Sequence, residues 1–273
     1  MTTRPDGPGR RLRLDLAYDG TEFAGWARQP GRRTVQSEVE LALAQVLRLA
    51  SVPRVTCAGR TDAGVHALGQ VAHVDLPAGV DADITSLTRW LRGVLPDDIT
   101  LWRVGEAPAG FDARFSALAR RYSYRVSDKP IDPLLRRHIV TWPRPLDIER
   151  LNAAAVGLLG EHDFAAYCRA KSEGTTIRRL LMATWQVDGD ALRLDISADA
   201  FCHGMVRSLV GAMLPVGDGR RDTGWPGEVL RSGQRDPAAV VAPAHGLVLE
   251  EVRYPDADGL LSRQQVTRAV RER

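Results

Sequence analysis

The sequence predicts an α+β protein made of two similar units, each with an antiparallel sheet, packed side by side with an active-site cleft between them. Its 273 residues are enough for one large domain or two of ordinary size. Each half reads as a strand, a helix and then paired strands. Ala, Pro and Gly interrupt the pattern near Ala107 to Gly110, so we expect an N-terminal domain at 1–108 and a C-terminal domain at 109–273.

The first half is expected to open with a strand and an amphipathic helix. After residues 1–10, which read as disordered, Leu12 to Tyr18 alternates apolar and polar side chains as a half-buried strand does. Thr34 to Ala50 places apolar residues at three- and four-residue steps, and Thr34 or Ser37 can cap its start. The other segments of this half with strand or helix patterns are Val55–Ala58, Gly69–Leu76, Asp83–Gly93 and Ile99–Val104.

The second half is expected to hold two longer helices and a hairpin. Asp147 to Leu159 has helical spacing, and Leu180 to Ser197 reads as two strands turning at Asp188-Gly189-Asp190. Phe201 to Gly217 is apolar almost throughout and helical in spacing over most of its length. The rest of this half is expected to contain a polar loop at 169–176, a short helix at Trp225–Arg231 and a polar tail at 256–273.

Composition indicates a soluble globular protein, with 44% hydrophobic and 26% charged residues and no apolar run long enough to cross a bilayer. The first eleven residues lack the apolar core of a secretory signal, so a cytoplasmic location is expected. Cys57, Cys168 and Cys202 lie far apart, and the histidines show no ligand spacing. The sequence therefore predicts neither a metal site nor a disulfide framework.

The positive charge of the chain is compatible with RNA binding without requiring it. The net charge is +3, and Lys129 and Lys171 are the only lysines, so the cations are nearly all arginines, whose planar fork suits phosphates and bases. A GC-rich genome would produce the same bias. Residues 110–144 form the most basic stretch, which is either a solvated face or a surface for unstacked RNA bases. The aromatic residues interleaved with its arginines are Phe111, Phe115, Tyr122 and Tyr124.

Asp62 is the centre of a polar segment between two predicted strands, where functional loops commonly lie. On spacing alone, Asp62 closes an Asx-turn in which Gly64 supplies a positive φ, and Arg60 is solvated. However, the string Gly59-Arg60-Thr61-Asp62-Ala63-Gly64-Val65-His66-Ala67 resembles the signature of the tRNA pseudouridine synthase A family. In that family the Asp is the catalytic nucleophile, so the resemblance implies this role for Asp62.

The resemblance covers most of residues 12 to 255. The other segments that resemble family motifs are Tyr18–Gln29, Leu95–Ile99, Phe111–Ala117, Arg121–Tyr124, Gly160–Phe164, Met205–Gly211 and Ala242–Leu249. The chain departs from the family pattern at two positions. Arg92 stands where the family usually has Asn, and Gly204 stands where His or Tyr is frequent. The first departure puts in doubt the local role of the Asn but not the fold.

The resemblance also implies roles for four further residues. On the residues alone, Tyr122 and Tyr124 share one face of a strand, which is more typical of core residues, but the resemblance implies that Tyr122 stacks on the target uracil. Leu247 is expected to lie beside the uracil, while Arg60 fills the space left by the flipped base or holds its phosphate. Arg207 is the one charged side chain on an apolar helix, and burying it without an anion would cost several kcal/mol. Arg207 therefore lies at the exposed edge of the helix, pairs with an acidic residue of its own domain or, as the resemblance implies, pairs with Asp62.

The function implied by the resemblance is isomerisation of uridine to pseudouridine at positions 38, 39 and 40 in the anticodon stem-loop of tRNA, by a homodimer. No cofactor is expected, because the reaction is an isomerisation. Two alternatives remain open from the residues themselves. One is a noncatalytic RNA-binding module that uses the basic, aromatic stretch, and the other is a hydrolase that uses Asp62 with His66.

Overall fold

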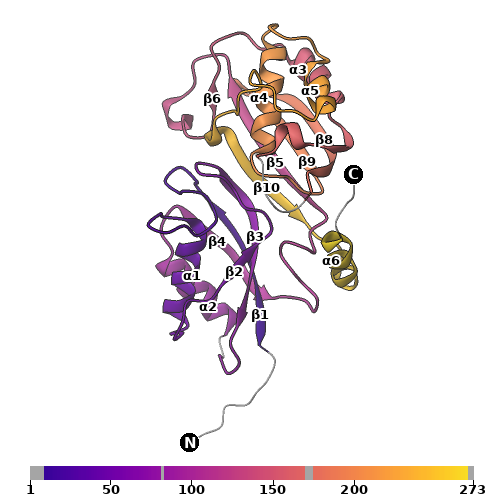
Figure 1. Cartoon of the computed structure of the whole chain (residues 1–273). Helices are drawn as coiled ribbons and strands as arrows, with labels where there is room; N and C mark the ends of the chain where they lie inside the picture. Colours follow the sequence, from indigo (N-terminus) through magenta and orange to yellow (C-terminus); the bar gives the residue numbers. More distant parts are fainter. Residues whose placement is uncertain (1–8, 81–82, 170–174, 270–273) are drawn as a thin grey trace, which may run out of the picture. The chain divides into compact units, whose positions relative to one another are not determined.

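The structure is a computed structural model that describes residues 9–80, 83–169 and 175–269 (Figure 1). The described chain forms two compact units: unit 1 takes in residues 9–118 and Glu251–Arg268, and unit 2 takes in Ala119–Glu250. Residues 109–118 and 251–268 therefore fold with unit 1, a different division from the domains expected at 1–108 and 109–273. The segments expected to be disordered at 1–10 and polar at 169–176 lie largely outside the described residues.

Unit 1 is an antiparallel sheet with two helices. Its strands run in the order β4-β1-β3, with the short β2 also paired to β3. Leu12, Leu14 and Leu16 of β1 are buried, and the side chains between them are half-buried, so the predicted alternation is confirmed. The elements are β1 (Arg10–Tyr18), α1 (Val35–Val46), β2 (Val55–Cys57), β3 (His66–Leu76), α2 (Ile84–Val94) and β4 (Ile99–Glu106).

Helix α1 begins where the sequence predicts and ends earlier. The Thr34 hydroxyl accepts from the Ser37 N–H, and the Ser37 hydroxyl accepts from the Thr34 N–H, which forms a reciprocal cap. The helix ends at Val46 instead of Ala50, because Arg48 has a φ of 50° in the left-handed region and breaks the helical backbone.

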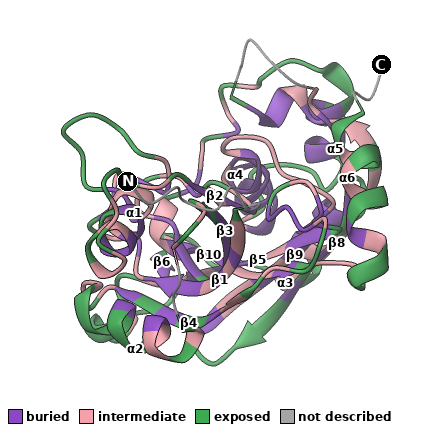
Figure 2. Cartoon of the chain, turned by 90° about the horizontal axis from the view of Figure 1, so that it is seen from below, coloured by how far each residue is buried: buried purple, intermediate pink, exposed green. Residues whose placement is uncertain are grey.

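The C-terminal part of unit 1 corrects the expected polar tail. Residues Leu260–Arg268 form helix α6, which follows a 3-10 turn at Ala257–Gly259. The side chains of Gln264 and Arg263 donate to the carbonyls of Gly110 and Ala117, at 2.5 and 3.2 Å. Leu260 is the buried residue of this helix, and most of the rest is exposed (Figure 2). One buried side chain gives no periodic pattern, so the sequence did not reveal the helix.

Unit 2 has strands in the order β5-β9-β8-β7, all antiparallel, with β6 parallel to β5. The predicted hairpin is confirmed as β8 and β9, which turn at Gly189 with a φ of 62°. Its elements are β5 (Ala119–Ser127), β6 (Val140–Thr141), α3 (Ile148–Val156), β7 (Gly160–Asp163), β8 (Ile177–Asp188), β9 (Ala191–Ala198), α4 (Met205–Gly217) and α5 (Trp225–Ser232), with 3-10 turns at Pro133–Leu135, Ala165–Tyr167 and Ala244–Gly246. The chain then passes from unit 2 into unit 1 within β10 (Leu247–Arg253).

Helix α4 is the buried helix of unit 2. Every one of its residues except Arg207 is buried, as the apolar run predicted (Figure 2). No helix in the described part of the chain is both long and apolar enough to cross a bilayer.

The structure overturns the expectation that the chain has no disulfide. Cys168 and Cys202 are joined, with their Cα atoms 5.6 Å apart, which is an ordinary separation for such a bond. The two cysteines are 34 residues apart in sequence. Folding brings them together, and next to the bond the Arg169 N–H donates to the His203 carbonyl at 3.0 Å. Sequence spacing carries no sign of that contact.

Candidate active site

The Asp62 loop joins β2 to β3 in unit 1 and is fastened on both sides. The Tyr18 hydroxyl of β1 bonds the Thr61 hydroxyl at 2.8 Å. The Gln70 amide of β3 donates to Tyr18 at 3.2 Å and to the Gly59 carbonyl at 2.8 Å. The two strands thus fix the residues on the N-terminal side of Asp62, whose own side chain is half-buried.

A turn closes on the other side of Asp62. The Val65 N–H donates to the Asp62 carbonyl at 3.2 Å, and Gly64 has a φ of 76°. The positive φ expected at Gly64 is therefore present, in a turn that the Asp62 backbone carbonyl closes. This turn fixes the backbone at Asp62 and therefore the direction of its side chain, so the turn and a functional role for Asp62 are compatible. Arg60, in the same loop, is exposed.

The glycine-rich segment after β1 packs against this loop and forms backbone hydrogen bonds with it. The Trp26 N–H donates to the Thr61 carbonyl at 3.0 Å, and the Gly64 N–H donates to the Phe23 carbonyl at 3.3 Å. At Gly25, φ is 95°, and a Cβ would lie 2.7 Å from the Thr61 carbonyl oxygen, so only glycine fits. Phe23 and Trp26 are buried, so these two aromatics pack in the core.

His66 has a structural position. It is 3% exposed, and its Nδ1 lies 3.0 Å from the Gly20 N–H and 3.1 Å from Asp19 Oδ1. The two contacts require opposite roles of Nδ1. We assign it as the acceptor, because Asp19 Oδ1 already accepts two hydrogen bonds from Thr21, whereas Nδ1 satisfies the buried N–H of Gly20. This arrangement gives no support to a hydrolase that uses Asp62 with His66.

Tyr122 and Tyr124 lie on β5 of unit 2, opposite Ile196 and Leu194 of β9. Tyr122 is 7% exposed, and the ring of Phe201 meets it edge to face, with centroids 5.2 Å apart. Tyr124 is fully buried, as expected for a core residue. The contact of Phe201 with Tyr122 could not be predicted, because an aromatic residue ahead of an apolar helix gives no sign of what it contacts.

Arg207 lies on α4 of unit 2 and is half-buried. Its Nε donates to the Ala242 carbonyl at 2.7 Å, and the Ala242 N–H donates to the Arg207 carbonyl at 3.0 Å. The predicted need for a partner is met at Nε by a backbone oxygen, which a sequence pattern does not reveal. Leu247 begins β10 and is buried.

The structure thus brings Asp62 and Arg60 together in one loop of unit 1, and it places Tyr122, Arg207 and Leu247 in unit 2. The expected pair of Asp62 with Arg207 joins the two units and remains a prediction. Within the described residues, no group of three or more His, Cys, Asp or Glu side chains is arranged to hold a metal ion.

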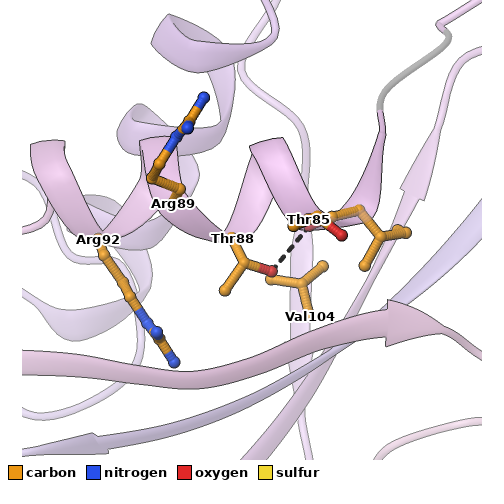
Figure 3. Close-up of a pocket in the computed structure, with 6 residues that line it drawn as sticks. Thr85, Thr88, Arg89, Arg92 and Val104 are labelled. Carbon is orange, nitrogen blue, oxygen red and sulfur yellow. Dashed lines mark hydrogen bonds between the residues drawn. The ribbon is translucent and has the colours of Figure 1, made fainter.

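A cavity of about 490 Å³ in unit 1 contains none of the predicted site residues (Figure 3). It is lined by Ile84, Thr85, Thr88, Arg89, Arg92 and Val104. Thr88 donates to the carbonyl of Ile84 within its own helix. Arg92 donates from Nε and Nη2 to the carbonyls of Leu101 and Trp102, at 2.8 and 2.6 Å. Arg92, which stands where the family usually has Asn, therefore ties α2 to β4.

Comparison with known proteins identifies the class. A family model described as tRNA pseudouridine synthase matches residues 16–116 and 154–255. The chain belongs to the tRNA pseudouridine synthase family.

Curated relatives align over nearly the whole chain. A tRNA pseudouridine synthase A of Frankia casuarinae is 57% identical over 270 residues, which are 96% of this chain and 95% of the relative. The protein of the same name in Streptomyces griseus is 56% identical over 92% of this chain and 90% of its own length. That of Mycobacterium leprae is 47% identical over 96% and 95%.

Proposed function

We propose that this protein converts uridine to pseudouridine in tRNA, at positions 38, 39 and 40 of the anticodon stem-loop. The observation that carries the proposal is the Asp62 loop, which Tyr18, Gln70 and the Gly25 segment hold in place in a chain of this family. The curated relatives are named tRNA pseudouridine synthase A, which supports tRNA as the substrate.

The reaction breaks the bond between C1' of the ribose and N1 of uracil, turns the base, and forms a bond from C1' to C5. The proton on C5 moves to N1, so the atoms balance without a co-reactant. In our proposal, Asp62 is the nucleophile, Tyr122 holds the loosened base with Leu247 beside it, and Arg207 pairs with the Asp62 carboxylate. Taking the uridine out of its stack costs a few kcal/mol, and Arg60 occupies the space or binds the phosphate.

The test is incubation with unmodified tRNA, followed by carbodiimide-based mapping of pseudouridine. We expect signals at the three positions with the natural chain. Asp62→Asn keeps the shape and removes the nucleophile, so it should abolish the signal while tRNA affinity stays within about threefold. Asp97→Asn, which changes an exposed carboxylate of the same unit, is the matched control and should leave the signal unchanged. A signal from Asp62→Asn near the natural rate would refute the role of Asp62.

The pairing of Arg207 with Asp62 has its own test. Arg207→Lys keeps the charge and loses the planar fork, so turnover should fall more than binding. Arg207→Met fits the apolar surroundings and should nearly silence the enzyme without unfolding it. Melting temperatures and single-turnover rates decide the matter. A Met variant that melts much earlier yet keeps its rate would show that Arg207 is structural.

We also propose that the protein acts as a homodimer, as the resemblance to the tRNA pseudouridine synthase A family implies, and that it acts in the cytoplasm. Light scattering on the purified chain, with and without tRNA, tests the dimer. A monomer in both conditions would contradict it.

A further inference from the structure

The backbone around Ala242 holds Arg207 in a fixed orientation. Two hydrogen bonds of opposite direction join these residues, from Arg207 Nε to the Ala242 carbonyl and from the Ala242 N–H to the Arg207 carbonyl. The bond at Nε fixes the plane of the guanidinium, because Nε lies in that plane. The direction in which Arg207 presents its terminal nitrogens therefore depends on where the carbonyl of Ala242 is held.

Tyr124 fixes the next carbonyl along this segment. Its hydroxyl donates to the Pro243 carbonyl at 3.1 Å, and its ring is fully buried. Burial raises the pKa of Tyr124 far above its ordinary value, against a smaller lowering by the nearby charge of Arg207, so the hydroxyl keeps its proton and remains a donor. The Ala242 carbonyl thus accepts a hydrogen bond from Arg207, and the next carbonyl, that of Pro243, accepts one from Tyr124.

Gly211 allows the segment to come this close to α4. A Cβ at Gly211 would lie 1.6 Å from the Val240 carbonyl oxygen and 3.4 Å from the Ala242 nitrogen. Both are backbone atoms, which cannot turn aside as a flexible side chain can. Any larger residue at 211 would push the segment off the helix and carry the Ala242 carbonyl with it.

We propose that Tyr124 and Gly211 are positioning residues for the isomerisation, which act through the Ala242 carbonyl to orient the guanidinium of Arg207. The inference rests on the proposed function, in which Arg207 serves the reaction. Neither residue needs to touch the substrate. Disturbing them should therefore lower the rate of the bound complex and leave tRNA affinity almost unchanged.

Tyr124→Phe tests this with the loss of a single oxygen. We expect the single-turnover rate to fall about 10- to 100-fold, the range for a small misplacement of a reacting group, with the Kd for tRNA within twofold. The matched control is Tyr167→Phe, because Tyr167 is also a buried tyrosine of unit 2 whose hydroxyl donates to a backbone carbonyl, that of Pro226 at 2.7 Å. It should lose a similar amount of thermal stability and keep its rate.

Two outcomes would overturn the inference: a natural rate in Tyr124→Phe, or an equal loss in Tyr167→Phe. Coupling gives a second readout. In an Arg207→Lys background, which has no Nε to bond Ala242, Tyr124→Phe should have a smaller effect than in the natural chain. Gly211→Ala should lower the rate as Tyr124→Phe does, and if it fails to fold, the tyrosine variants still decide. If Arg207→Met is silent while Tyr124→Phe is fully active, only this inference fails. If the natural chain makes no pseudouridine, the proposed function fails.

Discussion

Replacing His66 distinguishes a structural histidine from a chemical one next to the Asp62 loop. The structure shows Nδ1 of the buried imidazole accepting from the Gly20 N–H at 3.0 Å, which ties the start of β3 to the loop after β1. We consider two variants. His66→Ala removes the acceptor and the ring, whereas His66→Asn places an amide oxygen close to the position of Nδ1.

The expected loss of stability follows from these contacts. Leaving the Gly20 N–H buried without an acceptor costs about 1–3 kcal/mol. The space left by the ring adds about 1 kcal/mol or more. The free energy of unfolding of His66→Ala should therefore fall by about 3 kcal/mol, which corresponds to a decrease in melting temperature of roughly 6–12 °C. His66→Asn recovers the hydrogen bond and should lose about half as much.

The assay is single-turnover pseudouridine formation at a temperature where each variant is fully folded, alongside thermal melting. We expect His66→Asn to react within about threefold of the natural rate. A general base contributes about 10² to 10⁴ to a rate. A folded His66→Asn variant that loses a thousandfold or more would refute the structural role and restore His66 to the chemistry.

Three further predictions concern stability. Burial, with a smaller effect of a nearby arginine, lowers the pKa of His73 in the folded chain. The stability that this residue contributes is therefore complete above the unfolded pKa near 6.5 and is lost as pH falls through the folded pKa. Between pH 8 and 5, the melting temperature should fall less steeply in His73→Asn than in the natural chain, and an unchanged slope would contradict this. A thiol assay on the unfolded, unreduced chain should count one free thiol, that of Cys57, because Cys168 and Cys202 are joined, and a count of three would refute the bond. Reduction of the bond should lower the free energy of unfolding by at most about 4 kcal/mol for a loop of this length. Arg92→Leu removes the hydrogen bonds to two carbonyls of β4 and should lower the melting temperature by about 2–4 °C. The rate of pseudouridine formation should not change, and a large loss of that rate would place Arg92 in the active site.

The periodic elements were predictable because burial on one face leaves a repeating pattern. Leu12, Leu14 and Leu16 alternate with half-buried side chains, and that alternation is visible without coordinates. Helix α4 was predictable for the same reason, since nearly all of it is apolar. Helix α6 was not, because Leu260 is its one buried residue and hydrogen bonds from polar side chains to backbone carbonyls fasten it.

The candidate site residues were named from the sequence, but the groups that support them were not. Asp62, Tyr122 and Arg207 stand in motifs that a sequence displays directly. The group that fastens Thr61, next to Asp62, is a hydroxyl on a distant strand, that of Tyr18. The group that holds Arg207 is a backbone carbonyl, that of Ala242. A carbonyl is the same at every position of a chain, so no residue type reports that one of them serves as an acceptor.

Glycines are the exception, because they mark the places where such a backbone comes close. Gly25 lies against the Thr61 carbonyl, next to Asp62, and Gly211 lies against Val240, two residues before the carbonyl that holds Arg207. Each unit therefore positions its own charged residue with a stretch of backbone that a glycine admits. Backbone atoms cannot rotate away, so this support is stiffer than a packed side chain would be. A glycine beside a charged residue's motif therefore points to the backbone segment that holds that residue.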